Sequence, residues 1–123
     1  MSDAETERTP VRRMALDALS FLPRFAYGEQ AQIAEVTGSQ DGTTLGTGFA
    51  RFSNAEIPWT IKYDEVLLVV EGEVEVRTEG STFKLGPLDS LWLPKGTALV
   101  YASTSALVFY AIHPSNWAET AKS

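Results

Sequence analysis

The sequence contains no cysteine and a single histidine, His113, and these two shortages exclude several kinds of site. Without cysteine the chain forms no disulfide, no Cys-ligated zinc site, no iron–sulfur cluster and no thiol nucleophile. One imidazole also excludes, within one chain, any site that needs two or three histidine ligands. His113 itself follows an apolar run, and we expect it to be a surface or capping residue rather than a metal ligand.

Positive charge is also scarce, because 10 Lys and Arg residues stand against 16 Asp and Glu residues and give a net charge of −6. Binding of nucleic acid or of an anionic membrane needs a basic face. The longest uninterrupted apolar stretch, Ala106–Ile112, is too short to span a bilayer. Residues 1–10 are polar and lack the apolar segment of a secretory leader. We therefore expect a cytoplasmic protein with no nucleic-acid or membrane partner.

What is present fits one globular domain. The chain has 123 residues, of which 44% are hydrophobic and 21% charged, close to the globular average. A chain of this size buries about two-thirds of its surface, enough for a core without disulfides or metals. Residues 1–13 mix acidic residues, threonine and arginine and predict a flexible N-terminal lead-in. Residues 14–123 are then expected to form a single domain.

Alternating apolar residues and frequent turn residues predict an all-β domain from Gln30 onward. The clearest signal is Glu73–Arg77, where two valines alternate with three charged residues. It is joined through Glu71-Gly72 to the more apolar Glu65–Val70. The strand candidates, which recur about every 8–12 residues as in sandwiches and barrels, are residues 31–36, 45–53, 65–70, 73–77, 82–85, 90–93, 97–101 and 106–112. Met14–Phe25 is ambiguous between a short helix and an edge strand, and the last six residues allow a short helix.

Two motifs within the predicted strands resemble those of a known fold family. The matching residues are Glu65 and Gly72 in the first motif, and Gly86, Pro94 and Gly96 in the second, which carries two extra residues. These motifs are similar to those of the cupins. The resemblance implies an all-β, single-domain cupin, a double-stranded β-helix or jelly-roll barrel, with a core at about residues 30–117 and a short N-terminal extension.

A longer string, Ile57-Pro58-Trp59-Thr60-Ile61-Lys62-Tyr63-Asp64-Glu65, narrows the resemblance. Further matches are residues 49–52, 71–73, 93–96 and 114–117. Within the cupins the sequence looks most like the EutQ type, which is associated with bacterial ethanolamine utilisation. Full-length members of that type carry an additional N-terminal region, and the resemblance does not assign the function of that region to these residues.

The positions that hold the metal in metal-binding cupins carry other side chains here. The resemblance places Trp59, Ile61 and Leu99 where those cupins have histidines, and Glu65 where they have the glutamate. A single carboxylate does not hold a transition metal, because such sites supply three or more protein ligands. We therefore expect no metal and no cofactor.

Glu65 is the candidate catalytic residue, together with Tyr63. Strand alternation places Trp59, Ile61, Tyr63 and Glu65 on one face. If this face lines the barrel, its apolar surroundings raise the pKa of Glu65, which then suits a general acid or base with Tyr63 as proton partner. Alternatively, Glu65 organises the pocket mouth through a hydrogen bond, and Tyr63 is a core residue with a wet hydroxyl. The residues expected to line a ligand pocket are Trp59, Ile61, Trp92, Leu99 and Tyr101.

Four functions remain open from the sequence. The first is binding of a small polar metabolite by an accessory protein of ethanolamine or amine catabolism. The second is a metal-independent enzyme that uses Glu65 and Tyr63, and the third is phosphotransfer between acetate and ATP, as attributed to the EutQ type. The fourth is a scaffold partner of a bacterial microcompartment. We also expect a homodimer, because exposed strand edges need covering and the apolar residues of Met14–Phe25 suit such a contact.

Overall fold

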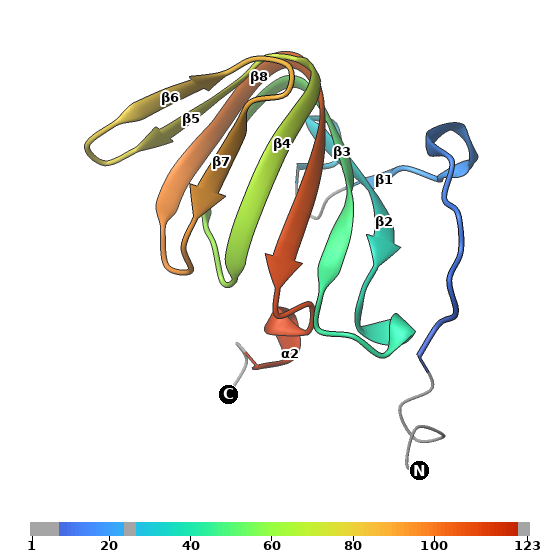
Figure 1. Cartoon of the computed structure of the whole chain (residues 1–123). Coiled ribbons are helices and arrows are strands. Elements are labelled where there is room, and N and C mark those ends of the chain that lie inside the picture. Colours follow the sequence, from blue (N-terminus) through green and yellow to red (C-terminus); the bar gives the residue numbers. More distant parts are fainter. Residues whose placement is uncertain (1–7, 24–26, 121–123) are drawn as a thin grey trace.

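The computed structural model describes residues 8–23 and 27–120, and most of them lie in antiparallel strands (Figure 1). The strands are β1 (Leu22–Pro23), β2 (Ala31–Thr37), β3 (Gly46–Thr60), β4 (Asp64–Gly72), β5 (Val74–Thr78), β6 (Thr82–Leu85), β7 (Ser90–Leu93) and β8 (Ala98–His113). The helical elements are the short 3₁₀-helices η1 (Leu16–Ala18) and η3 (Ser39–Asp41) and the single-turn helix α2 (Trp117–Thr120). The all-β prediction is confirmed. None of the helices among the described residues has the length and apolar content needed to cross a membrane.

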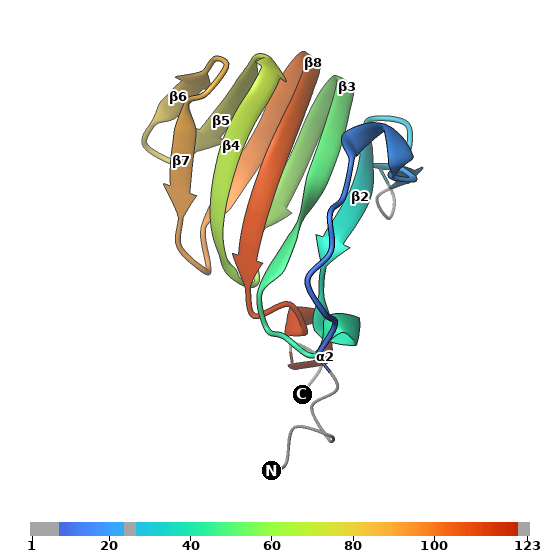
Figure 2. The ribbon, with the colours of Figure 1, turned by 45° about the vertical axis from the view of Figure 1, so that its right-hand side comes forward.

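All eight strands belong to one sheet, and its two longest strands organise it. β3 and β8 pair along their whole length, from Gly46 opposite Ile112 to Thr60 opposite Ala98. The second half of β8 also pairs with β4, and its first half pairs with β5. β2 and β1 continue the sheet beyond β3, β7 beyond β4, and β6 beyond β5. Figure 2 shows β7, β4, β8, β3 and β2 side by side in this order.

β3 and β8 bend together at one point, and the bend changes which residues face inward. Between the pairs Ser53–Ser105 and Ala55–Ser103, Asn54 has a positive φ of 45°. Before Asn54 the even residue Phe52 of β3 is buried, whereas after it the odd residue Ala55 is buried. Asparagine is one of the few residues that adopt such a φ at low cost. The sheet can therefore curve over at this point without interrupting the β3–β8 ladder.

Two strand predictions are corrected by the pairing. The expected strands 97–101 and 106–112 form one continuous strand, β8, because residues between them pair with β3. The strand candidates 65–70 and 73–77, which are joined through Glu71-Gly72, do not pair with each other, since β4 pairs with β7 and β8 while β5 pairs with β6 and β8. Gly72 lies at the corner between them with a φ of +82°, and a Cβ there would lie 2.1 Å from the Ser105 carbonyl oxygen. The chain therefore turns a corner at Gly72 instead of forming a hairpin.

The hydrophobic core fills the interior of the curved sheet. Val74 and Val76 of β5 are 1% and 0% exposed, which confirms the alternation read from Glu73–Arg77. The other fully buried core side chains, contributed by β3, β4, β8 and the β3–β4 turn, are Ile57, Ile61, Leu67, Val69 and Val108. Burial of each such side chain stabilises the fold by about 1.5–3 kcal/mol before entropy costs are counted.

The predicted flexible lead-in is partly anchored. Residues 1–7 lie outside the described part of the chain, but Thr9 and Arg12 bind Asp41, at the end of η3. The Thr9 hydroxyl donates to Asp41 Oδ1 over 2.6 Å and Arg12 Nη1 donates to the same oxygen over 2.9 Å. The hydrogen bond from Arg12, with those from Thr9 and the Gly38 backbone N–H, holds the pKa of the Asp41 carboxyl well below its usual range. These hydrogen bonds connect the segment around Thr9–Arg12 to η3, and the flexibility of residues 1–13 stays a prediction.

The described part of the ambiguous segment Met14–Phe25 contains both kinds of structure, whereas residues 24 and 25 lie outside the described part of the chain. η1 covers three of its residues, and the two-residue strand β1 pairs with β2, with Leu22 opposite Ile33. Pro23 ends up in an edge strand, as its lack of a backbone N–H favours. At the other end of the chain, the helix expected over the last six residues begins at Trp117, and residues 121–123 lie outside the described part.

Candidate functional site

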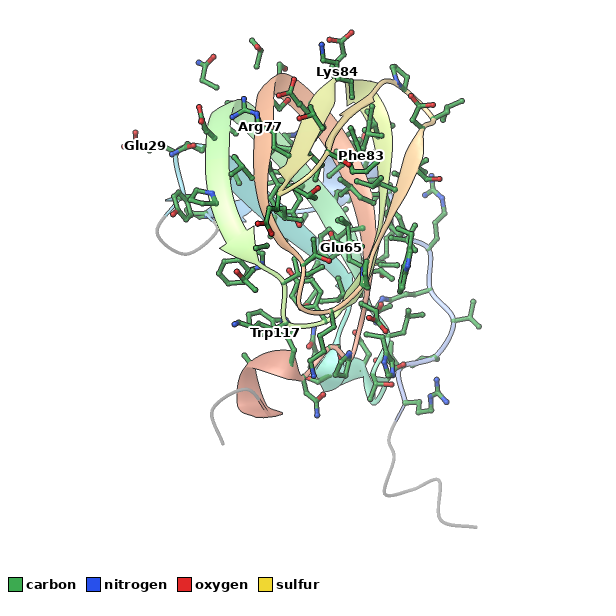
Figure 3. All side chains as sticks on the ribbon, turned by 90° about the vertical axis from the view of Figure 1, so that its left-hand side faces the viewer. Glu29, Glu65, Arg77, Phe83, Lys84 and Trp117 are labelled. Carbon is green, nitrogen blue, oxygen red and sulfur yellow. The ribbon has the colours of Figure 1, made fainter. Side chains whose placement is uncertain are left out.

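A cavity of about 220 Å³ lies within the curved sheet, between β2, β3, β4, β8 and the start of α2. The inward alternation of these strands brings polar and aromatic side chains into it. Those used below are Phe52, Tyr63, Glu65, Tyr101, Tyr110 and Trp117. Figure 3 shows Glu65 within the barrel and Trp117 toward the end where α2 lies.

A larger and more open groove of about 830 Å³ lies over the β5–β6 end of the sheet. Arg77, one of its charged side chains, is paired with two carboxylates. Arg77 Nε donates to Glu75 over 2.7 Å and Arg77 Nη1 to Glu56 over 3.2 Å. These partners raise the pKa of Arg77 further above its usual value. Because Arg77 is already engaged by two carboxylates at an exposed surface, the more enclosed cavity around Glu65 is the better candidate site.

Glu65 is the charged centre of the cavity. Its place on β4, opposite Ile112 of β8 and Leu93 of β7, points its side chain inward, and only 6% of it is exposed. The Tyr101 hydroxyl, itself buried, donates a hydrogen bond to Glu65 Oε1 over 2.9 Å. A carboxylate taken out of water is costly unless it is hydrogen-bonded. The Tyr101 hydroxyl therefore offsets part of the cost of placing this acid inside the barrel.

Aromatic rings form much of the rest of the lining. The ring of Tyr101 stacks on that of Phe52, with centroids 5.9 Å apart. Toward α2, the Trp59 indole N–H donates to the Tyr63 hydroxyl over 3.2 Å. The Trp117 ring lies 5.2 Å from that of Tyr63 and 6.1 Å from that of Trp59. α2 thus contributes an aromatic residue that packs over the end of the cavity.

The structure brings the predicted catalytic pair and part of the predicted pocket together. Glu65, Tyr63 and Tyr101 all line the cavity. Trp59 is not among the residues that line it, but its indole N–H donates to the Tyr63 hydroxyl. The roles of these residues in catalysis or binding remain predictions.

Three other expected pocket residues lie elsewhere. Ile61 and Leu99 are 0% and 4% exposed and belong to the hydrophobic core rather than to the cavity lining. Trp92 is 59% exposed, and it pairs with Val66, which is 45% exposed, on the outer face of β4 and β7. The placement of Trp92 in the pocket is therefore corrected: Leu93 beside it points inward, so Trp92 points outward.

Several cavity residues were not singled out from the sequence. They are Glu35 on β2, Phe52 on β3, Tyr110 on β8 and Trp117 on α2. Tyr110 alternates in step with the buried Val108, which is a usable signal for an inward side chain. Trp117 follows the end of the sheet, where strand alternation carries no information.

The residues at the cupin metal positions do not fit a metal ion. An indole N–H such as that of Trp59 is only a donor, and Ile61 and Leu99 have no ligand atom. In the part of the chain that the structure describes, no three side chains of the His, Cys, Asp and Glu types come close enough to hold a metal. Glu65 is left as the one oxygen ligand of that set.

Comparison with known proteins decides the family. The model of the family described as "Ethanolamine utilisation protein EutQ" matches residues 25–119. The chain belongs to the EutQ family. An acetate kinase EutQ of Escherichia coli (strain K12) is 42% identical over 83 residues, 67% of this chain and 35% of that protein. The acetate kinase EutQ of Salmonella typhimurium (strain LT2) is 37% identical over 86 residues, 69% of this chain and 38% of that protein. The chain thus spans little more than a third of the length of these two curated relatives.

Solved structures show the same fold for this EutQ-family chain. A crystal structure of an ethanolamine utilization protein Q of Salmonella typhimurium LT2 is 30% identical, with a TM-score of 0.80 over 86% of this chain and 88% of that one. An RmlC-like cupin from Shewanella frigidimarina NCIMB 400 is only 16% identical, yet it has a TM-score of 0.70 over 85% of this chain and 92% of that one. The prediction of a cupin of the EutQ type is confirmed.

Proposed function

We propose that the cavity of this EutQ-family cupin binds a small polar metabolite without a metal ion, in an accessory protein of ethanolamine or amine catabolism. The observation that carries the proposal is the carboxylate of Glu65, buried in a cavity and hydrogen-bonded to Tyr101 over 2.9 Å. A core built only for stability gains little from a buried charge, since an apolar side chain of similar size is often as good. The family, associated by its description with ethanolamine utilisation, supplies the metabolic setting.

The size of the cavity supports a small ligand. The cavity volume of about 220 Å³ is somewhat below the roughly 300–1,000 Å³ usual for ligand pockets, which favours a metabolite of a few non-hydrogen atoms.

An acid–base enzyme is the second candidate, and one contact favours it. The Tyr101 hydroxyl lies 2.9 Å from Glu65 Oε1, within the range at which a proton passes between two side chains. Tyr101 therefore joins the Glu65–Tyr63 pair expected from the sequence. Two further functions stay proposals: acetate–ATP phosphotransfer, suggested by the names of the relatives, and a scaffold role in a microcompartment. A homodimer at the β1 edge, where Leu22 is 64% exposed, is also a proposal.

Ligand-induced stabilisation of the full 123-residue chain tests these functions. We would measure thermal unfolding with ethanolamine, acetate, ATP, Fe²⁺, Mn²⁺ and Zn²⁺, for the wild type, for Glu65→Gln, and for Glu73→Gln as a control that removes an exposed carboxylate. A metabolite present at 100 times its Kd stabilises the fold by about 2.7 kcal/mol. We expect this effect for a small metabolite, and its loss in Glu65→Gln but not in Glu73→Gln.

Two results would overturn the proposal. Strong stabilisation by one of the divalent metals would contradict metal-independent binding. ADP formation that needs both acetate and ATP and disappears in Glu65→Gln would replace the accessory function with catalysis. Circular dichroism of each variant checks that it is folded.

A further inference from the structure

We infer that two copies of this chain associate face to face through an apolar patch on the outer face of β4, β7 and β8. This outer patch consists of Val66 and Leu68 of β4, Trp92 of β7, and Phe109 and Ala111 of β8. It lies on the opposite face of the sheet from the cavity, so the association does not depend on what the cavity binds.

β4 carries apolar side chains on both of its faces. Glu65 and Leu67 line the cavity, so strand alternation directs Val66 and Leu68 to the outer face. In an antiparallel sheet with one face in water, the outward residues are commonly polar. Two successive aliphatic residues at outward positions therefore indicate a face that another surface covers.

The strand register extends this apolar surface to both neighbours of β4. Val66 lies opposite Trp92 and Ala111, and Leu68 lies opposite Phe109. Val66 and Trp92 are 45% and 59% exposed. The segment that precedes β1 lies beside β2, at the other side of the sheet from β4 and β7 (Figure 2). The part of the chain that the structure describes therefore leaves this face open to a partner.

Beside the outer patch, the turn between β6 and β7 holds one more apolar side chain in water. Leu88 is 78% exposed and has a φ of +72°, a backbone conformation that is costly for leucine. Its N–H donates to the Val69 carbonyl oxygen over 2.7 Å, and the Val69 N–H donates to the Asp89 carbonyl oxygen over 3.0 Å. These two bonds tie the turn to β4. Strain of this kind persists mostly where it serves a function, and contact with a partner is a function that an exposed leucine serves.

The free edge of β7 is a poorer surface for association than the face. Among the described strands β7 pairs only with β4, so its other edge is open. The strand has only four residues, and Pro87 and Pro94 lie on its two sides. Short edge strands with nearby prolines resist pairing with a strand of another molecule. The partner is therefore expected to pack on the face of the sheet.

Charges at the two ends of the outer patch make a second copy the fitting partner. At the end where β4 begins lie the exposed Lys62 and Lys95 and one acid, Asp64, whose Oδ1 accepts a hydrogen bond from the Lys95 backbone N–H over 2.9 Å. At the end where β4 finishes lie the exposed acids Glu71 and Asp89. A two-fold axis that crosses the strands brings the first end of one copy against the second end of the other. The lysines then face carboxylates, and the contact is made twice.

Sedimentation equilibrium of the full chain measures the dissociation constant of the dimer. We expect Trp92→Thr to raise this constant at least about 30-fold, because a central tryptophan commonly anchors an interface and threonine still suits a strand. Leu22→Thr is the matched control, since Leu22 is 64% exposed in β1, at the opposite edge of the sheet. This control should change the constant less than about twofold. Circular dichroism checks that both variants are folded.

Two charge reversals test the orientation without changing an apolar side chain. Lys95→Glu and Glu71→Lys should each weaken the dimer at least about tenfold, because like charges then face each other across the interface. An equal mixture of the two variants should recover the wild-type affinity, since each chain then meets the opposite charge at both ends. A wild type that stays monomeric, an equal loss in Trp92→Thr and Leu22→Thr, a dimer that Trp92→Thr leaves intact, or a mixture no tighter than the separate variants would each overturn the inference.

Discussion

Replacing Tyr101 by phenylalanine removes one hydroxyl group and leaves the ring in place. The ring keeps its stacking on Phe52, with centroids 5.9 Å apart, so the packing change is small. What is lost is the 2.9 Å hydrogen bond to the Glu65 carboxylate. Hydrogen bonds to charged groups contribute about 1.5–3 kcal/mol. Tyr101 and Glu65 are only 5% and 6% exposed, so only a water held in the cavity could replace the hydroxyl, and such a replacement would place the loss at the lower end of this range. We expect Tyr101→Phe to lower the free energy of unfolding by about 1.5–3 kcal/mol.

Urea unfolding of the full chain measures this loss, and Tyr27→Phe is the matched control. Tyr27 is half-buried against the same core, and its hydroxyl makes no hydrogen bond to the residues that the structure describes. Its removal should change the free energy of unfolding by less than about 0.5 kcal/mol. In a double-mutant cycle, Tyr101→Phe and Glu65→Gln should show a coupling energy of about 1 kcal/mol or more. Equal losses for Tyr101→Phe and Tyr27→Phe, with no coupling, would refute the argument that this contact stabilises the buried acid.

Three further substitutions, the first with a matched control, test the fold by urea unfolding. Gly72→Ala should lower the free energy of unfolding by more than about 2 kcal/mol, because φ is +82° and a Cβ would lie 2.1 Å from the Ser105 carbonyl oxygen. The control Gly80→Ala, with open space around it, should be nearly neutral. Equal effects of the two substitutions would contradict the corner assigned to Gly72. Leu88→Gly should stabilise the protein by up to about 1 kcal/mol, because Leu88 has a φ of +72° and is 78% exposed. A loss of stability would show that the strain at Leu88 is smaller than the cost of the entropy that glycine adds to the unfolded chain. The folded-state pKa of Asp41 lies below its unfolded value of about 3.9, so its stabilising contribution is complete above that pH and is lost as the pH falls through the folded-state pKa. Asp41→Asn should therefore lower the midpoint of urea unfolding at pH 6. The same substitution should make the midpoint fall less steeply between pH 4 and 2 than it does in the wild type. An equal fall in both proteins would contradict the stabilising role of Asp41.

Strand alternation predicted the inward orientation of Glu65 because β4 is regular around it. Alternate residues of this segment, Tyr63, Glu65 and Leu67, are all buried, and the period of two holds across the turn between β3 and β4. The alternation of Val74 and Val76 in β5 was equally readable. In such regular segments the sequence pattern and the fold express the same physical rule, that successive side chains point to opposite faces.

The same rule could not locate the whole cavity, because β8 changes its inward face. Tyr101 and Tyr110 are odd and even residues of one strand, yet both line the cavity. The bend opposite Asn54 lies between them, and a sequence pattern does not mark it unless the left-handed asparagine is recognised. The prediction that Trp92 lines the pocket was wrong for a different reason. Both faces of β7 carry large apolar residues, so alternation there does not say which of them is buried.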